Sequence, residues 1–87
     1  MAYRITWSKQ AEKHFRKLDK AVRGRVSATI EDLADDPRPP GLEPVVSMPG
    51  VLRVRKGGYR VLYRVDDDSR EIWIEDVRKR SEAYGGH

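Results

Sequence analysis

The second half of the chain alternates apolar and polar side chains in three runs that short turns separate. The runs are VLRVRK (51–56), YRVLYRV (59–65) and EIWIEDV (71–77), and the turns are Gly57–Gly58 and the polar stretch DDDSR. Alternation with a period of two is typical of strands that bury one face, and a two-residue glycine turn joins antiparallel strands. We therefore predict a three-stranded antiparallel meander, whose apolar face the rest of the chain has to cover.

The first half of the chain supplies a further strand and two helices. Residues 3–7, YRITW, are β-branched and aromatic and predict a strand. Ser8 is a good helix N-cap, and apolar residues at helical spacing predict a first helix over 9–18. Asp19 can cap a second helix, whose apolar stripe consists of Val22, Val26, Ile30 and Leu33. The proline-rich stretch DDPRPPG stops that helix, and residues 37–50 are expected to form a loop.

The order of the elements is therefore β-α-α-β-β-β, which predicts an α+β fold. An amphipathic helical hairpin would pack on one face of an antiparallel sheet and leave the other face open. At 87 residues the chain is expected to form one domain, 1–87, with a thin core. Any site should then lie on an open face or in a shallow groove.

The open face of this sheet is predicted to be basic. If the apolar residues of 51–56 point towards the helices, Arg53 and Arg55 lie on the open side. The same alternation over 59–65 places Arg60 and Arg64 beside them.

The last strand leaves two arrangements open. Strict alternation from Ile72 and Ile74 would bury Asp76 and Arg78. Either Trp73 and Val77 point inward instead, or a bulge near Asp76–Val77 resets the register. We favour the bulge or the end of the strand, because neither charged side chain tolerates unpaired burial.

Composition removes several kinds of chemistry. The chain has no cysteine, and its histidines, His14 and His87, lack the spacing of metal ligands. Gly57–Gly58 lacks the spacing of a phosphate-binding loop, so we expect neither a metal nor a cofactor. No apolar run approaches the roughly 18 residues that span a bilayer. The start, MAYRITWSKQ, lacks the order of a signal peptide, so we expect a cytoplasmic protein with no membrane partner.

A net charge of +4 suits a polyanionic partner. Guanidinium groups bind phosphate oxygens in pairs, and a tyrosine ring can stack on an unpaired base. A set of basic residues and one tyrosine could therefore bind single-stranded RNA: Arg53, Arg55, Lys56, Arg60, Arg78, Lys79, Arg80 and Tyr84. The alternative is that the basic side chains are only solvated residues of the strands and that Tyr84 packs on the sheet.

Two segments resemble a known family. LRVRKGGYRVLYRVDD (52–67) and VRKRSEAY (77–84) are similar to the RelE branch of the RelE/ParE toxins of bacterial type II toxin–antitoxin systems. The GYR-x-x-Y core is shared widely, whereas R-x-R-S-E-x-Y is more specific to the RNA-cleaving branch. The resemblance implies the RelE-like microbial RNase fold and a metal-independent toxin that cleaves mRNA in the ribosomal A site. The 2′-hydroxyl of the RNA is then the nucleophile, and the product is a 2′,3′-cyclic phosphate.

The resemblance also implies roles for individual residues. Arg60 would bind the scissile phosphate, Arg78 would contact phosphate and the leaving oxygen, and Tyr84 would stack on a codon base. Arg53 and Arg55 stand where relatives carry a Lys-x-Lys pair, and because a guanidinium does not readily act as a base, they are expected to stabilise charge. Proton transfer would then fall to Lys56 or Tyr84, and further RNA contacts to Lys56, Arg64, Lys79 and Arg80.

A different acid/base arrangement occurs in other relatives, which pair a Glu with a histidine near the terminus. Glu43 has no matching partner in this sequence, so we assign it no role.

Two other functions remain open at this level. One is a gyrase-poisoning toxin of the ParE type, and the other is an RNA- or protein-binding module without catalysis. The expected partners are an acidic, RelB-like antitoxin, the ribosome and mRNA, since a basic open face suits an acidic peptide that folds as it binds.

Overall fold

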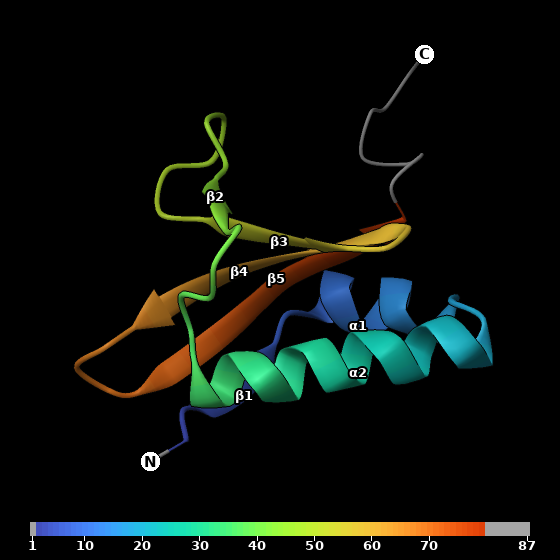
Figure 1. Cartoon of the computed structure of the whole chain (residues 1–87), viewed down its shortest axis with the longest axis horizontal. Helices are drawn as coiled ribbons and strands as arrows, with labels where there is room; N and C mark the ends of the chain where they lie inside the picture. The colour runs from blue at the N-terminus through green and yellow to red at the C-terminus, as the bar shows by residue number, and fades with distance from the viewer. Residues whose placement is uncertain (1, 80–87) are drawn as a thin grey trace.

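A mixed five-stranded sheet with the order β1-β5-β4-β3-β2 forms one layer of the fold, and two helices form the other (Figure 1). The computed structural model describes residues 2–79. Its elements are β1 (Arg4–Trp7), α1 (Lys9–Arg16), α2 (Lys20–Asp35), β2 (Glu43–Pro44), β3 (Leu52–Lys56), β4 (Tyr59–Asp66) and β5 (Glu71–Lys79). The predicted α+β class and the antiparallel meander, β3-β4-β5, are confirmed.

Two strands differ from the prediction. β1 joins the sheet beside β5 and runs parallel to it, because the two helices carry the chain back before the meander begins. β2 lies inside the predicted loop 37–50 and pairs with the start of β3. The sheet is therefore mixed and has one more strand than the sequence pattern indicates.

The helix boundaries follow from local signals. The hydroxyl of Ser8 accepts a hydrogen bond from the backbone N–H of Ala11 at 2.9 Å, which is the predicted N-cap. α1 ends at Arg16, two residues before the predicted end. α2 ends at Asp35, since Asp36 precedes a proline and takes an extended conformation. Within residues 2–79, neither helix is long and apolar enough to cross a membrane.

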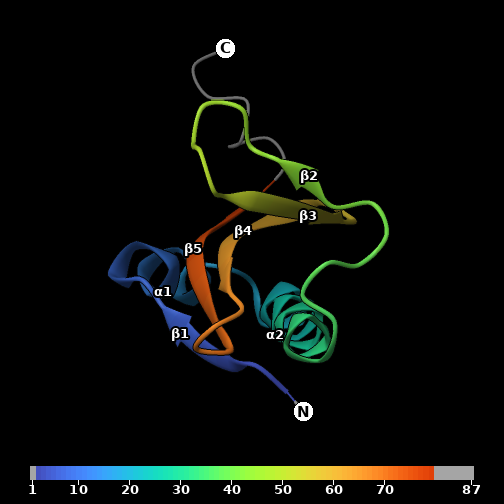
Figure 2. The same cartoon turned by 90° about the vertical axis from the view of Figure 1, so that its left-hand side faces the viewer.

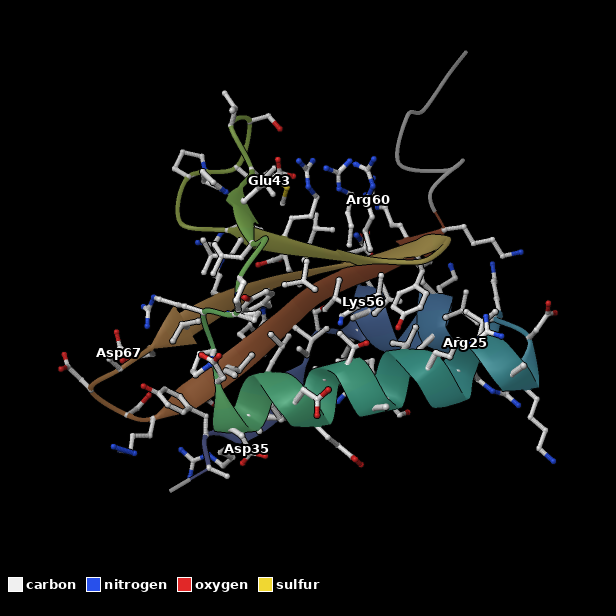
Figure 3. All side chains as sticks on the ribbon, viewed as in Figure 1. Arg25, Asp35, Glu43, Lys56, Arg60 and Asp67 are labelled. Atoms are coloured by element: carbon white, nitrogen blue, oxygen red, sulfur yellow. The ribbon has the colours of Figure 1, made fainter. Side chains whose placement is uncertain are left out.

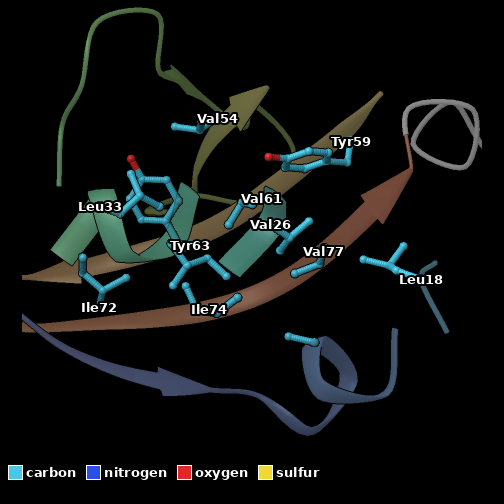
Figure 4. Packing of buried hydrophobic residues seen from close by; sticks show 12 residues of the cluster. Leu18, Val26, Leu33, Val54, Tyr59, Val61, Tyr63, Ile72, Ile74 and Val77 are labelled. Atoms are coloured by element: carbon cyan, nitrogen blue, oxygen red, sulfur yellow. The ribbon is translucent and has the colours of Figure 1, made fainter. Parts of the chain in front are cut away.

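The core lies between α2 and the meander (Figure 4). Val26, Ile30 and Leu33 of the predicted stripe are buried, as are these residues of the sheet: Val54, Tyr59, Val61, Tyr63, Ile72, Ile74 and Val77. Two tyrosine hydroxyls of β4 donate hydrogen bonds to backbone carbonyls, one in α2 and one just after it. Tyr59 donates to the carbonyl of Arg25 at 2.9 Å, and Tyr63 donates to the carbonyl of Pro37, just beyond the helix, at 2.7 Å.

A bulge in β5 settles the register that the sequence left open. Tyr63 pairs with Ile74 and Leu62 pairs with Asp76, so Glu75 is the extra residue. The predicted bulge is therefore confirmed, one residue earlier than expected, and the strand does not end there. Trp73 is 37% exposed, which makes the alternative with an inward Trp73 wrong.

Helix α1 lies along β5 where β1 ends (Figure 2). The backbone N–H of Ser8 donates to the carbonyl of Ile74 at 3.0 Å, and its hydroxyl donates to the carbonyl of Glu75 at 2.8 Å. Ala11 and Leu18 are buried against the core. Helix α2 packs against β4, and α1 lies beside β5 (Figure 2).

Candidate active site

Three arginines on three neighbouring strands lie directly across from one another. Arg55 of β3 pairs with Arg60 of β4, and Arg60 pairs with Arg78 of β5. Side chains at such paired positions start about 4.5–5.5 Å apart, and like charges there repel. Arg53 lies two residues along β3 on the same face. We call these four residues the arginine cluster. Such a concentration of positive charge costs stability unless an anion binds to it.

The arginine cluster lies on the side of the sheet away from α2, as Figure 3 shows for Arg60, while Arg78 at its end also borders α1. Its members differ in accessibility. Arg60 is only 5% exposed, although alternation had placed it on an open face. The side chains of Arg55 and Arg78 are 49% and 40% exposed, which leaves their guanidinium groups accessible to a ligand.

Glu43 contacts the arginine cluster, although the sequence pattern assigns it no role. β2 sets Glu43 across from Arg53, and Nη2 of Arg53 donates to Oε1 of Glu43 at 2.6 Å. Arg55 lies 3.3 Å from the same oxygen. The hydrogen bond from Arg53 and the charges of Arg55 and Arg53 lower the pKa of Glu43. The cluster therefore already holds one carboxylate, which a bound phosphate would displace or supplement.

Arg78 is held by a buried carboxylate. Nε of Arg78 donates to Oδ2 of Asp76, which is 1% exposed. The same carboxylate accepts hydrogen bonds from Nε2 of Gln10 at 2.9 Å and contacts Nδ1 of His14 at 2.6 Å. Although burial alone raises the pKa of Asp76, the hydrogen bonds from Arg78, His14 and Gln10 outweigh it and lower the pKa. Asp76 thus stays charged and fixes one edge of the Arg78 guanidinium.

The remaining predicted site residues lie elsewhere or outside the described chain. Lys56 faces α2, where it borders a hollow with Asp32 and Asp36 (Figure 3). Arg64 shares the face of the cluster, but its Nε donates to Glu75 at 2.8 Å. Lys79 pairs with the inward Tyr59 and faces α1. Arg80 and Tyr84 lie outside the described residues 2–79.

The cluster is suited to charge stabilisation rather than to proton abstraction. Guanidinium groups stay protonated at any physiological pH and bind phosphate oxygens in pairs. Within residues 2–79, no three His, Cys, Asp or Glu side chains are grouped as a metal site requires. The arrangement can therefore hold a phosphodiester and the negative charge that develops when such a group reacts.

A small α+β domain with this sheet and this arginine cluster corresponds to a class of bacterial toxins. A family model described as "ParE toxin of type II toxin-antitoxin system, parDE" matches residues 5–84, and the chain belongs to this family. Within the family it is RelE-like. It is 31% identical to the mRNA interferase toxin RelE of Escherichia coli (strain K12) over 88 residues, which cover 97% of this chain and 92% of the relative.

Solved structures agree with the sequence comparison. The toxin–antitoxin complex RelBE2 of Mycobacterium tuberculosis matches with a TM-score of 0.80 at 26% identity, over 92% of this chain and 100% of that chain. The isolated E. coli RelE toxin matches with a TM-score of 0.78 at 29% identity, over 95% of this chain and 92% of that chain. The resemblance that residues 52–67 and 77–84 indicated is confirmed.

Proposed function

We propose that this toxin cleaves mRNA held in the ribosomal A site and so arrests translation. The observation that carries the proposal is the row of Arg55, Arg60 and Arg78 across three strands. It concentrates three positive charges on one face of the sheet, and the guanidinium groups of Arg55 and Arg78 are accessible to a phosphodiester. The relative named mRNA interferase toxin RelE supports the same reaction class.

The proposed reaction needs no atoms beyond those of the RNA. The 2′-oxygen attacks phosphorus, the bond to the 5′-oxygen breaks, and the products are a 2′,3′-cyclic phosphate and a 5′-hydroxyl. The 2′-hydroxyl gives its proton to water or to Tyr84, the predicted proton-transfer residue, and the departing 5′-oxygen takes one up from the same source, so the protons balance. Arg60 would hold the scissile phosphate, and Arg55 and Arg53 would stabilise charge on its oxygens. Arg78 would stabilise the leaving oxygen.

In this proposal the ribosome holds the RNA in the geometry that cleavage requires. Cleavage requires the 2′-oxygen, the phosphorus and the 5′-oxygen to lie in line, and an RNA strand in solution seldom holds that geometry. The arginine cluster lies on an accessible sheet face rather than in a deep pocket, so the chain can bind the backbone but would need the decoding site to fix it. Tyr84 remains the predicted stacking residue for a codon base.

The decisive experiment expresses the wild type, Arg60→Ala and Arg78→Ala in a bacterial host. Primer extension then maps cuts in a translated and an untranslated copy of one transcript. We expect growth arrest and cuts in the translated copy alone for the wild type, and neither effect for the two variants. Arg4→Ala is the matched control, since Arg4 is exposed on β1 outside the cluster and should leave both effects intact. Equal cutting of the untranslated copy would contradict the dependence on the ribosome.

A second candidate is inhibition of DNA gyrase. The observation in its favour is that the matching family model is described as a ParE toxin. This function predicts DNA breaks and an SOS response on expression, with intact mRNA during the first minutes. Growth arrest with intact transcripts and DNA breaks would therefore move the assignment to gyrase, and arrest without either would favour a binding protein without catalysis.

The expected partner is an acidic antitoxin. Glu43 already occupies Arg53 and Arg55 from within the chain, which shows that a carboxylate fits the cluster. A peptide rich in Asp and Glu that folds on binding could cover the rest. The structural relatives include a complex with an antitoxin. If a small acidic protein is encoded beside this gene, its co-expression should abolish the growth arrest, and arrest that persists despite co-expression would contradict the pairing.

A further inference from the structure

A cavity of about 320 Å³ lies where the end of α1 meets the end of β5. It is lined by His14 of α1, by Lys17 and Leu18 just after this helix, and by Arg78 and Lys79 of β5. Four of these five side chains are cationic or become so on protonation, and the fifth is apolar. A cavity of this composition suits a compact anion with an apolar group attached to it.

The acidic group behind this cavity does not cancel its charge. Asp76 contacts two of the lining residues, His14 and Arg78, but its carboxylate is 1% exposed. Its oxygens accept from Gln10, His14 and Arg78, and from the backbone N–H of Val77. The negative charge is thus turned away from the cavity and committed to internal partners.

Asp76 also orients the two groups that it binds. It engages Nδ1 of His14, which leaves Nε2 as the ring nitrogen available to a ligand. It engages Nε of Arg78, which leaves the two Nη groups, the pair of donors that can bind a phosphate side by side. The side chains of His14 and Arg78 are 38% and 40% exposed, so both remain accessible while they are held.

The cavity adjoins the arginine cluster. Arg78 is the last member of the row that begins at Arg55, and it also lines the cavity. An RNA strand whose scissile phosphate lies at Arg60 would therefore meet the cavity with a neighbouring nucleotide. Leu18 is the apolar residue of the cavity lining, and at 6% exposed it belongs mainly to the core.

We propose that this cavity binds a second phosphate of the RNA strand, next to the phosphate that the arginine cluster holds. This proposal rests on the proposed function. Lys17 and Lys79 supply point charges. Arg78, and His14 in its doubly protonated form, supply directed hydrogen bonds to the phosphate. Two adjacent phosphate sites would fix the direction in which the strand crosses the sheet, which a single site does not.

The test measures binding of a fluorescent 2′-O-methyl RNA hexanucleotide, which the proposed reaction does not cleave because its 2′-oxygens are blocked. Anisotropy titrations over a series of salt concentrations compare the wild type, Lys17→Ala and Lys13→Ala. Lys13 and Lys17 are both exposed, but Lys13 does not line the cavity, so the pair is matched for charge.

We expect Lys17→Ala to weaken binding several-fold at low salt. The slope of the logarithm of the association constant against the logarithm of salt concentration is negative. Its magnitude should decrease by about 0.7, the value for one lost phosphate contact on a single strand. Lys13→Ala should keep both the affinity and the slope close to those of the wild type. Equal losses in the two variants would show a general charge effect and overturn the site, and so would no loss in either.

A nuclear magnetic resonance titration gives an independent readout that no substitution disturbs. The hexanucleotide should shift the ring nitrogen signals of His14. Unmoved signals of His14 at saturating hexanucleotide would overturn the proposal.

Failure of the proposed function would look different from failure of this site. Loss of binding in Lys17→Ala together with wild-type protein that never cleaves mRNA would retain the phosphate site and reject the nuclease. Cleavage of mRNA by the wild type together with unchanged binding in Lys17→Ala would retain the nuclease and reject the site.

Discussion

Oδ1 of Asp76 lies 2.6 Å from Nδ1 of His14, although the two residues are 62 positions apart in the sequence. The contact attaches α1 to β5 at the residue that follows the bulge, where β1 no longer pairs with β5. Because the carboxylate is 1% exposed, its charge depends on the donors that surround it. The bulge allows this burial: it lets Val77 enter the core while Asp76 stays beside α1.

Replacement of Asp76 should therefore destabilise the fold. Asp76→Asn keeps the shape of the side chain but replaces one carboxylate oxygen by an NH2 group. That group cannot accept the hydrogen bonds that Gln10, His14 and Arg78 donate to Asp76. We expect the free energy of unfolding to fall by about 1.5–3 kcal/mol, the range for hydrogen bonds to a charged group. Urea unfolding at pH 7 measures it. Asp68→Asn is the control, since Asp68 is exposed in the β4–β5 turn and should change stability by less than about 0.5 kcal/mol.

The same carboxylate predicts a specific response to acid. Its pKa is lowered in the folded protein, because hydrogen bonds from Arg78, His14 and Gln10 outweigh the opposite effect of burial. A lowered pKa contributes stability that is complete above the unfolded value of about 3.9 and is lost as the pH falls through the folded value. The difference in unfolding free energy between wild type and Asp76→Asn should thus narrow below about pH 4.

Urea titrations of both proteins at a series of pH values from 7 to 3 would measure this narrowing. Asp67 and Glu43 also have lowered pKa values, but both residues are present in the two proteins and cancel in the comparison. A difference that stays constant down to pH 3 would contradict the assignment of the effect to Asp76.

Local periodicity predicted the parts of the site that lie on regular strands. Arg53, Arg55 and Arg60 follow from alternation on either side of a two-residue turn, because the turn also fixes which residues face each other. The prediction that Lys56 contacts RNA rests on its charge alone. Lys56 is an even number of residues from Leu52 and Val54, so alternation points its side chain towards α2, as the structure shows.

Contacts between distant segments were beyond the reach of these patterns. β2 has two residues, which is too short to show alternation, so nothing in the sequence brought Glu43 to Arg53. His14 reads as one polar residue on a helix surface, and its partner lies across a bulge whose position the pattern gave only to within a residue. Sequence patterns therefore predict the two helices and the four longer strands, but neither β2 nor the side-chain contacts that link distant elements.

Removal of the carboxylate at Glu43 should strengthen RNA binding. Glu43→Gln keeps the size of the side chain but frees Arg53 and Arg55 from an ion pair that competes with phosphate. We expect the uncleavable hexanucleotide to bind several-fold more tightly at low salt, and the gain to shrink as salt rises. Glu31→Gln makes the same charge change on an exposed position of α2 and should have a smaller effect. Equal gains in both variants would indicate net charge rather than the cluster.

The buried hydroxyl of Tyr63 predicts the behaviour of the fold at high pH. Burial raises the pKa of Tyr63 to about 12, and the hydroxyl donates to the carbonyl of Pro37 at 2.7 Å. In the unfolded chain a tyrosine loses its proton near pH 10, so between about pH 10 and 12 the folded state holds a proton that the unfolded state has released. The stability of the wild type should fall as the pH rises through this range.

Tyr63→Phe removes the hydroxyl and its hydrogen bond, so its free energy of unfolding at pH 7 should be about 1 kcal/mol lower than that of the wild type. Above pH 10 its free energy of unfolding should decline less steeply with pH than that of the wild type. Urea unfolding of both proteins at pH 7, 9, 10 and 11 would test this, and parallel curves over that range would contradict it.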